Sequence, residues 1–257
     1  MSILPPTGDR VSLKSLIPLL PSGIQQRIRL THYSSKLKSA RISDETDLGV
    51  IEHLVSSGDT VMDVGASFGL FTRFLADKVG SNGSVYAFEP TGVMSQVLEH
   101  SVTVLGLANV IISNQALSDK TGKASIAIPM NDDQTPNYGE ASLTEILEEQ
   151  SAEREEIERT TLDSFCDEKE VDDLTFLKLD VAGHEIEVLN GARITLEKFR
   201  PTILLAVNED LDSPGHGSRV RDLAGYLGYG INVFELGKIR KREHGERFAN
   251  YVLLPED

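Results

Sequence analysis

Acidic residues and glycines stand at the ends of apolar segments in this chain, at positions where a ligand can be bound. The segment "TVMDVGASFG" ends an apolar run with Asp63 and then turns on Gly65 and Gly69. A second apolar segment ends at Glu89, about 20 residues further on, where an acid can accept hydrogen bonds from both hydroxyls of a ribose. A third ends near Gln115. This spacing is typical of a nucleoside-binding site.

The glycine turn argues against a phosphate-bearing ligand. A dinucleotide fingerprint requires glycine at positions 65, 67 and 70, whereas this chain has Gly65, Ser67 and Leu70. A P-loop is also excluded, because no lysine follows the glycines. A nucleoside without phosphates that lies beside a cationic group fits these residues better. S-adenosylmethionine is such a ligand.

A fourth apolar segment, "LTFLKLDVAGHE", carries the candidates for catalysis. Asp180 ends the predicted strand, Gly183 allows a tight turn, and His184 follows. Methyl transfer from a sulfonium is an in-line displacement, so the acceptor must be held close, and Asp180 or His184 could take its hydroxyl proton. Alternatively, Asp180 caps the following helix and His184 only hydrogen-bonds the strand ends. The histidines show no spacing typical of metal ligands, so no metal site is predicted.

Apolar segments that alternate with amphipathic ones from residue 46 onward must position these residues. Strands that alternate with helices predict right-handed crossovers and a parallel sheet covered on both faces. We therefore expect an α/β domain over residues 46–257, preceded by an N-terminal arm over residues 1–45. The final segment, "FANYVLLP", follows a tight turn and should form an antiparallel strand.

Residues 118–160 interrupt the alternation. "DKTGKASIAIP" predicts a pair of strands, "MNDDQTPNYGEASL" a loop, and "TEILEEQSAEREEIER" an acidic helix; the inserted loop and helix span residues 128–160. Asn137, Tyr138 and Ser142 offer polar groups suited to a hydroxyl-rich acceptor. Long loops in compact domains often contribute to function.

Two basic segments contrast with an acidic chain whose formal net charge is −15. Residues 1–43 hold seven lysines or arginines and one acid, so the arm either docks on the acidic remainder of the chain or contacts an anionic membrane surface or lipid-linked substrate. The second basic segment is the turn "KIRKREHGER". It is either a solvated hairpin tip or a site for an anionic acceptor such as a phosphorylated sugar. Its basic residues are Lys238, Arg240, Lys241, Arg242 and Arg247.

Several short motifs together resemble the FkbM family of methyltransferases. They are "GDTVMDVGASFGLFT", "VYAFEP", "NQALSD", "TTLDSF", "LKLDVAGHEIEVLNGA" and "NYVLLP", and they cover about residues 45–254. The resemblance implies a Rossmann-like class I methyltransferase with a mostly parallel seven-stranded sheet whose last strand is antiparallel. It also implies S-adenosylmethionine as methyl donor and an oxygen acceptor on a saccharide or small natural product.

The resemblance also assigns cofactor residues by position. Glu89 would take the ribose. Asp63, Gly65, Ala66 and Gly69 would form the methionine side of the pocket, and Gln115 and Ala116 would border the adenine. One position departs from the family pattern, because Ala182 stands where family members usually carry an acid, so any role of that acid is absent here.

Composition limits the other possibilities. A net charge of −15 repels nucleic acid, and no apolar run approaches the roughly 20 residues of a transmembrane helix. With one cysteine and no recognisable signal peptide, the chain is predicted to be cytoplasmic. Two alternatives stay open: a nicotinamide-dependent oxidoreductase with a degenerate glycine turn, and a non-catalytic module that keeps the fold for partner binding.

Overall fold

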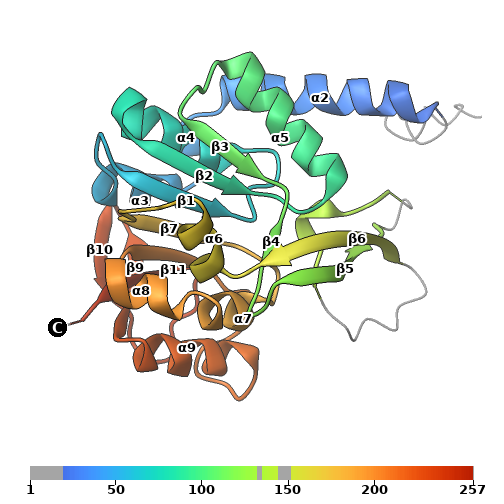
Figure 1. Cartoon of the computed structure of the whole chain (residues 1–257). Helices are drawn as coiled ribbons and strands as arrows, with labels where there is room; N and C mark the ends of the chain where they lie inside the picture. Colours follow the sequence, from blue (N-terminus) through green and yellow to red (C-terminus); the bar gives the residue numbers. More distant parts are fainter. Residues whose placement is uncertain (1–19, 132–134, 144–151, 257) are drawn as a thin grey trace, which may run out of the picture.

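Eight strands form one central sheet in the computed structural model, which describes residues 20–131, 135–143 and 152–256. These strands are β1 (Thr60–Val64), β2 (Ser84–Phe88), β3 (Val110–Ser113), β7 (Phe176–Leu179), β8 (Thr202–Ala206), β9 (Tyr229–Glu235), β10 (Lys238–Lys241) and β11 (Asn250–Pro255). Their spatial order is β10-β9-β11-β8-β7-β1-β2-β3 (Figure 1).

Most of this sheet is parallel, as expected from the sequence. The five strands from β3 to β8 run in one direction. The last strand, β11, lies between β8 and β9 and is antiparallel to both. The segment predicted as a basic turn contributes an eighth strand, β10, because its first four residues pair with β9 in a tight hairpin.

Helices cover both faces of the sheet (Figure 1). On one face lie α3 (Leu48–Leu54), α4 (Leu70–Val79) and α5 (Gly92–Leu105), and on the other lie α6 (Leu162–Glu168), α7 (Glu185–Asn190), α8 (Arg193–Phe199) and α9 (His216–Tyr226). Short 3₁₀ helices are η2 (Ile42–Asp44), η3 (Gly80–Asn82) and η4 (Tyr138–Glu140). The segment after Gly183 forms two helices, α7 and α8, which are divided at Gly191, where an added Cβ would lie 2.0 Å from the carbonyl oxygen of Ser118.

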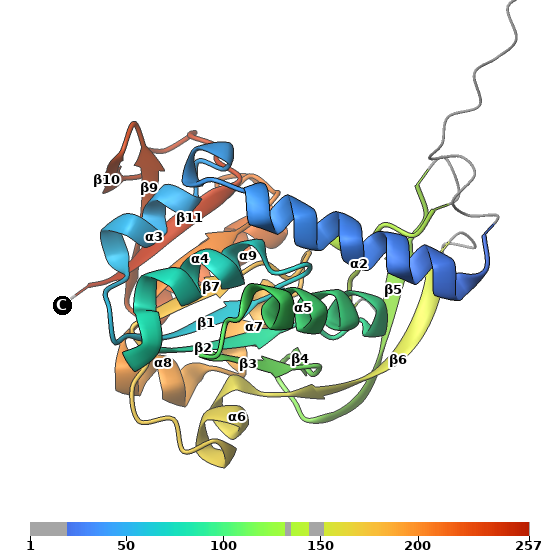
Figure 2. The ribbon, with the colours of Figure 1, turned by 90° about the horizontal axis from the view of Figure 1, so that it is seen from above.

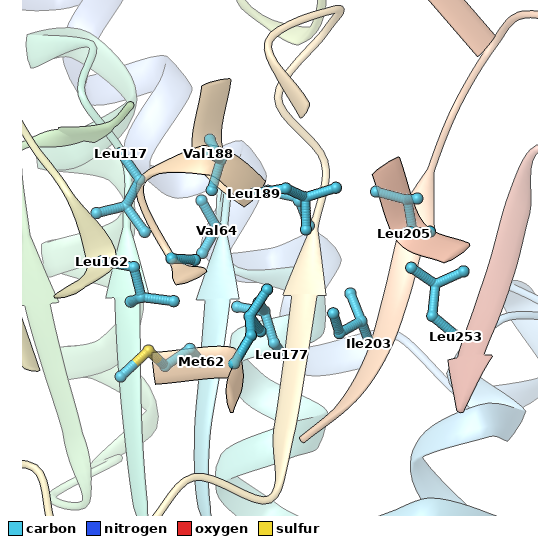
Figure 3. Packing of buried hydrophobic residues seen from close by; sticks show 14 of the residues in the cluster. Met62, Val64, Leu117, Leu162, Leu177, Val188, Leu189, Ile203, Leu205 and Leu253 are labelled. Atoms are coloured by element: carbon cyan, nitrogen blue, oxygen red, sulfur yellow. The ribbon is translucent and has the colours of Figure 1, made fainter. Parts of the chain in front are cut away.

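Alternating side chains of the central strands supply the two halves of the core. In β1, Val61 packs with α3 and α4, whereas Met62 and Val64 pack with the opposite helices, since successive strand side chains point to opposite faces. Figure 3 shows the half of the core that packs against α6, α7, α8 and α9, in which Met62 and Val64 lie near residues of β7 and α7. The same alternation places Asp63 and its register partner in β7, Lys178, on the α4 face.

A second sheet holds three strands in the order β4-β6-β5 and corrects two predictions. These strands are β4 (Ala116–Leu117), β5 (Gly122–Pro129) and β6 (Ala152–Thr160). The acidic segment predicted as a helix is the strand β6 over residues 152–160, while residues 144–151 of that prediction lie outside the described residues. Pairing with β5 overrides the helix propensity of glutamate, because Ile157 is buried while its neighbours on both sides are exposed. The predicted strand pair within 119–129 is the single strand β5.

The third apolar segment, "NVIISNQAL", is predicted as one strand over residues 109–117 but is divided between the two sheets. Its residues form β3 in the central sheet and β4 beside β6. β3 is the edge strand of the central sheet, and its pairing with β2 ends at Ser113.

The described part of the N-terminal arm is the helix α2 (Ser22–Ser39), which lies along α5 (Figures 1 and 2). Gln26 donates to Gln96 of α5 at 3.2 Å, and Leu37 is fully buried. Arg73 of α4 donates to the carbonyl oxygens of Leu37 and Ala40 at the end of α2. This helix docks on the body of the protein. Among the described residues, however, no cation of α2 forms an ion pair with an acidic side chain, so packing and hydrogen bonds hold it.

Candidate functional site

A cavity of about 280 Å³ opens where the carboxyl ends of β1, β2 and β7 meet. Parallel strands bring their carboxyl ends to the same edge of a sheet, so residues far apart in the chain become neighbours there. Of the residues predicted from the sequence, those on the cavity wall are Gly65, Ala66, Glu89, Gln115, Ala116, Asp180 and His184. Asp63 and Gly69 are not on the wall.

The turn after β1 is held between its two neighbouring strands. The N–H groups of Gly65 and Ala66 donate to the carbonyl oxygen of Phe88 at 3.1 and 2.9 Å. Gly65 has φ +78°, and an added Cβ would lie 1.8 Å from the carbonyl oxygen of Asp180. Only glycine fits at this crossing, and its small size keeps the ends of β1, β2 and β7 close together.

Glu89 is buried in the cavity wall and is already bound by protein donors. Its Oε2 accepts from the N–H of Ser67 at 2.9 Å, and its Oε1 accepts from the N–H and hydroxyl of Thr91 at 3.0 and 2.6 Å. Burial raises the pKa of Glu89, while these hydrogen bonds and the charge of Lys178 oppose the rise. A carboxylate oxygen has two lone pairs, so Oε2 keeps one for a ligand hydroxyl.

Lys178 is a buried cation at the cavity that the sequence analysis missed. Its Nζ lies 3.1 Å from the carbonyl oxygen of Gly65 and 3.4 Å from carboxylate oxygens of both Asp63 and Asp180. Burial alone would lower the pKa of Lys178, but the two carboxylates outweigh it and raise the pKa. A charged residue inside the apolar strand "FLKL" was the signal that could have revealed it.

Asp63 acts on the cavity only through Lys178. It is fully buried, and its Oδ2 accepts from the hydroxyl of Thr72 in α4 at 2.6 Å. Gly69 has a structural position too, because it precedes α4 at φ +94° and an added Cβ would lie 2.8 Å from Leu98. Both residues shape the site from behind its wall.

The side chains of Asp180 and His184 differ in their exposure and in the number of their protein partners. The Asp180 side chain is 54% exposed at the cavity rim. Nε2 of His184 lies 2.9 Å from the hydroxyl of Ser118, and its Nδ1 lies 3.5 Å from Glu187. Burial lowers the pKa of His184, so the ring is neutral near pH 7, with both nitrogens facing protein groups.

The inserted loop forms the wall opposite the strand ends. Tyr138 lines the cavity, and the hydroxyl of Ser142 donates to the carbonyl oxygen of Ala182 at 2.9 Å. Ala182 has φ +48°, which is unusual for a residue other than glycine. Asn137 is not on the wall; its N–H donates to Pro129 at 2.7 Å. Position 182 therefore contacts the loop through its backbone carbonyl.

The second basic segment lies away from this cavity. Three strands, β8, β11 and β9, separate β10 from β7 in the sheet. Arg240 pairs with Glu235 and Glu246 at 2.8 and 2.6 Å, and Arg242 pairs with Asp212 at 2.7 Å. These arginines are occupied by neighbouring carboxylates, which favours the reading of a surface hairpin.

Two features are absent from the part of the chain that the structure describes. The described residues contain no group of three or more histidine, cysteine or acidic side chains placed to hold a metal ion. Every helix in this part of the chain is too short or too polar to cross a bilayer.

Comparison with known proteins identifies the domain. The profile of the Methyltransferase FkbM domain matches residues 63–243, well over half of the chain. No curated protein matches the chain in sequence.

The solved structures that are similar to this chain have low sequence identity to it. A methyltransferase FkbM from Methylobacillus flagellatus KT superposes with a TM-score of 0.51 at 15% identity over 94% of this chain, which spans 57% of that protein's length. A SAM-dependent O-methyltransferase from Thermotoga maritima has a TM-score of 0.44 at 15% identity, with 92% of this chain and 72% of that chain covered. A SAM-dependent methyltransferase from Aquifex aeolicus has a TM-score of 0.42 at 20% identity, with 86% and 96% covered.

Proposed function

Because the chain belongs to the FkbM methyltransferase family, we propose that it is an S-adenosylmethionine-dependent O-methyltransferase acting on a hydroxyl of a saccharide or small natural product. The charge of the cavity supports this proposal most directly. Glu89, Asp180 and the Asp63 carboxylate behind the wall outnumber Lys178, which is the sole lysine or arginine among the described residues lining the cavity. A ligand with a positive group and no phosphate fits this balance.

The residues present fit the cofactor. Glu89 would accept a hydrogen bond from the ribose at the free lone pair of Oε2, and Gln115 and Ala116 would border the adenine. Gly65 and Ala66 would lie along the methionine side. When bound, S-adenosylmethionine supplies an electrophilic methyl group on a sulfonium.

Asp180 is the better supported partner for the acceptor hydroxyl. It is exposed at the rim, and Lys178 holds one of its oxygens, so the other is available to accept the hydroxyl proton. His184 would need to leave Ser118 before it could do the same. We therefore assign Asp180 as general base and His184 as a residue that supports the turn after β7.

Calorimetry tests the choice of cofactor. Titration of the full chain with S-adenosylmethionine should show saturable binding, and titration with NAD should show none. Binding of NAD alone would overturn the proposal in favour of the oxidoreductase. Release of S-adenosylhomocysteine on incubation with a panel of hydroxylated saccharides would exclude the non-catalytic alternative.

Glu89→Gln tests the role of the buried carboxylate. The side-chain nitrogen of glutamine replaces one carboxylate oxygen and cannot accept a hydrogen bond. It would face protein N–H or ligand hydroxyl groups that donate, so we expect the affinity for S-adenosylmethionine to fall about 10- to 100-fold. Glu99→Gln removes an equal charge from an exposed position on α5 and should leave the affinity unchanged. Equal affinities of the Glu89→Gln variant and the wild type would show that Glu89 does not bind the ribose.

A further inference from the structure

One stripe of α2 faces the aromatic wall of the cavity. Arg29, Tyr33 and Lys36 are spaced four and three residues apart, so they lie on one side of the helix. The Arg29 guanidinium lies 5.5 Å from the ring centroid of Tyr138, Tyr33 stacks on Phe68 at 4.8 Å, and the Lys36 ammonium lies 4.7 Å from the Phe68 ring. Phe68 and Tyr138 both line the cavity. No described residue of α2 lines the cavity itself, but this stripe contacts two residues of the cavity wall.

Arg29 and Lys36 differ from the paired arginines of the second basic segment in having no carboxylate partner among the described residues. Arg240 and Arg242 are paired with carboxylates, whereas neither Arg29 nor Lys36 forms an ion pair with any described side chain. Arg29 uses one nitrogen to donate to Gln26 at 2.9 Å, and its guanidinium has other donors left. Two cations of α2 thus lie against the cavity wall, whereas the carboxylates of Glu89 and Asp180 line the cavity itself.

We propose that Arg29 and Lys36 bind a phosphate group of the methyl acceptor beside the cavity wall. The proposal rests on the proposed function, since it names the class of acceptor for that site. A guanidinium binds phosphate oxygens through two parallel hydrogen bonds, and an ammonium adds a point charge. With the cofactor in the cavity, a phosphorylated acceptor would place its anion on α2 and its hydroxyl toward Asp180.

The rest of the surface favours a small anion over a polyanion. Glu153 and Glu155 lie on β6 near Tyr138 and would repel an extended phosphate backbone. The net charge of −15 adds to this repulsion. A phosphorylated sugar or a single lipid-linked phosphate carries fewer charges than a phosphate backbone, so the same glutamates repel it less.

Line broadening in ³¹P NMR tests the site with defined probes: glucose 1-phosphate, inorganic phosphate and pyrophosphate, added to the full chain. The double variant R29Q/K36Q should bind the best of these probes at least about ten-fold more weakly than the wild type. The control variant R27Q/K38Q removes the same charge from exposed positions elsewhere on α2 and should stay within two-fold. Equal losses of probe affinity in both variants overturn the proposal. A wild-type protein that binds none of the probes and no vesicles overturns it as well.

Sedimentation with phosphatidylglycerol vesicles distinguishes a lipid phosphate from a soluble one. A loss confined to R29Q/K36Q supports the site with a lipid-linked source. Equal losses in R29Q/K36Q and R27Q/K38Q indicate general attraction of α2 to an anionic surface and contradict a site beside the cavity wall. Calorimetry of the wild type with S-adenosylmethionine is run in parallel, so failure of the cofactor proposal is seen separately from failure of the phosphate site.

Discussion

Lys178 connects the glycine turn, the core of the sheet and the exposed Asp180. Its ammonium has three hydrogens and three oxygen partners, on Gly65, Asp63 and Asp180. Asp63 lies directly opposite Lys178 in the register of β1 and β7. The pair fixes the carbonyl of the turn and the direction of the Asp180 carboxylate at the same time.

Lys178→Met should lower the free energy of unfolding by about 3–5 kcal/mol, because it leaves the buried Asp63 carboxylate without a counter-charge. The double variant D63N/K178M should recover part of this loss, since it removes both charges. Urea denaturation of the three proteins measures the difference. A double variant less stable than K178M would show that the two side chains do not act as a pair.

His184 predicts a dependence of stability on pH. Burial lowers its pKa in the folded protein below the ordinary value of 6.5, so the unfolded chain takes up a proton at higher pH than the folded chain does. The contribution of His184 to the free energy of unfolding is therefore fully present above pH 6.5. As the pH falls below 6.5, the free energy of unfolding decreases by up to about 1.4 kcal/mol per pH unit.

Replacing His184 by glutamine should reduce the loss of stability between pH 7.5 and pH 5.5 relative to the wild type. The exposed His32 provides the matched control, and His32→Gln should keep the wild-type slope. Urea denaturation at each pH gives the free energies. A slope unchanged by His184→Gln would mean that the residue titrates alike in both states.

At the scale of elements, the site depends on how closely three strand ends approach one another. Gly65 and Gly106 both have positive φ, at +78° and +69°, yet only Gly65 lies against another backbone. A Cβ added at Gly106 would meet no atom within 4 Å. Alanine at Gly106 therefore introduces backbone strain alone, whereas alanine at Gly65 introduces backbone strain and a steric clash.

We expect Gly65→Ala to destabilise the fold by at least about 3 kcal/mol, because its Cβ would overlap the Asp180 carbonyl. Gly106→Ala should cost about 1–2 kcal/mol, from the left-handed conformation alone. Thermal denaturation of the two variants tests the ranking. Similar losses would show that β1 and β7 can separate at this crossing without cost.

The whole molecule combines a strongly acidic chain with a cationic helix at one cavity. With a net charge of −15, self-repulsion should destabilise the folded state at low ionic strength. The Debye length shortens from about 30 Å at 0.01 M to about 10 Å at 0.1 M, so added salt screens this repulsion.

We expect the melting temperature to rise between about 10 and 150 mM NaCl, by about 2–4 °C for each kcal/mol of repulsion relieved. KCl should give the same increase, since screening depends on ionic strength. A melting temperature that falls with either salt would show that attractive ion pairs, such as those of Arg240 and Arg242, outweigh the repulsion.

The sequence alone determined the order of the elements and the edge of the sheet where the candidate site lies. Alternating apolar and amphipathic segments require a parallel sheet, and a parallel sheet brings Gly65, Glu89, Gln115 and Asp180 to one edge. These are local patterns and chain connectivity, so the order of residues is sufficient to predict them. The acidic strand β6 was wrongly predicted as a helix because its pairing partner, β5, decides its conformation.

Only the tertiary structure decided which polar groups reach the cavity and which lie behind it. Asp63 reaches it through Lys178, and His184 is engaged by Ser118, which is 66 positions away in the chain. The placement of α2 beside Phe68 and Tyr138 was equally inaccessible to local patterns. Distances, burial and charge pairing depend on residues far apart in sequence, and those contacts exist only once the chain has folded.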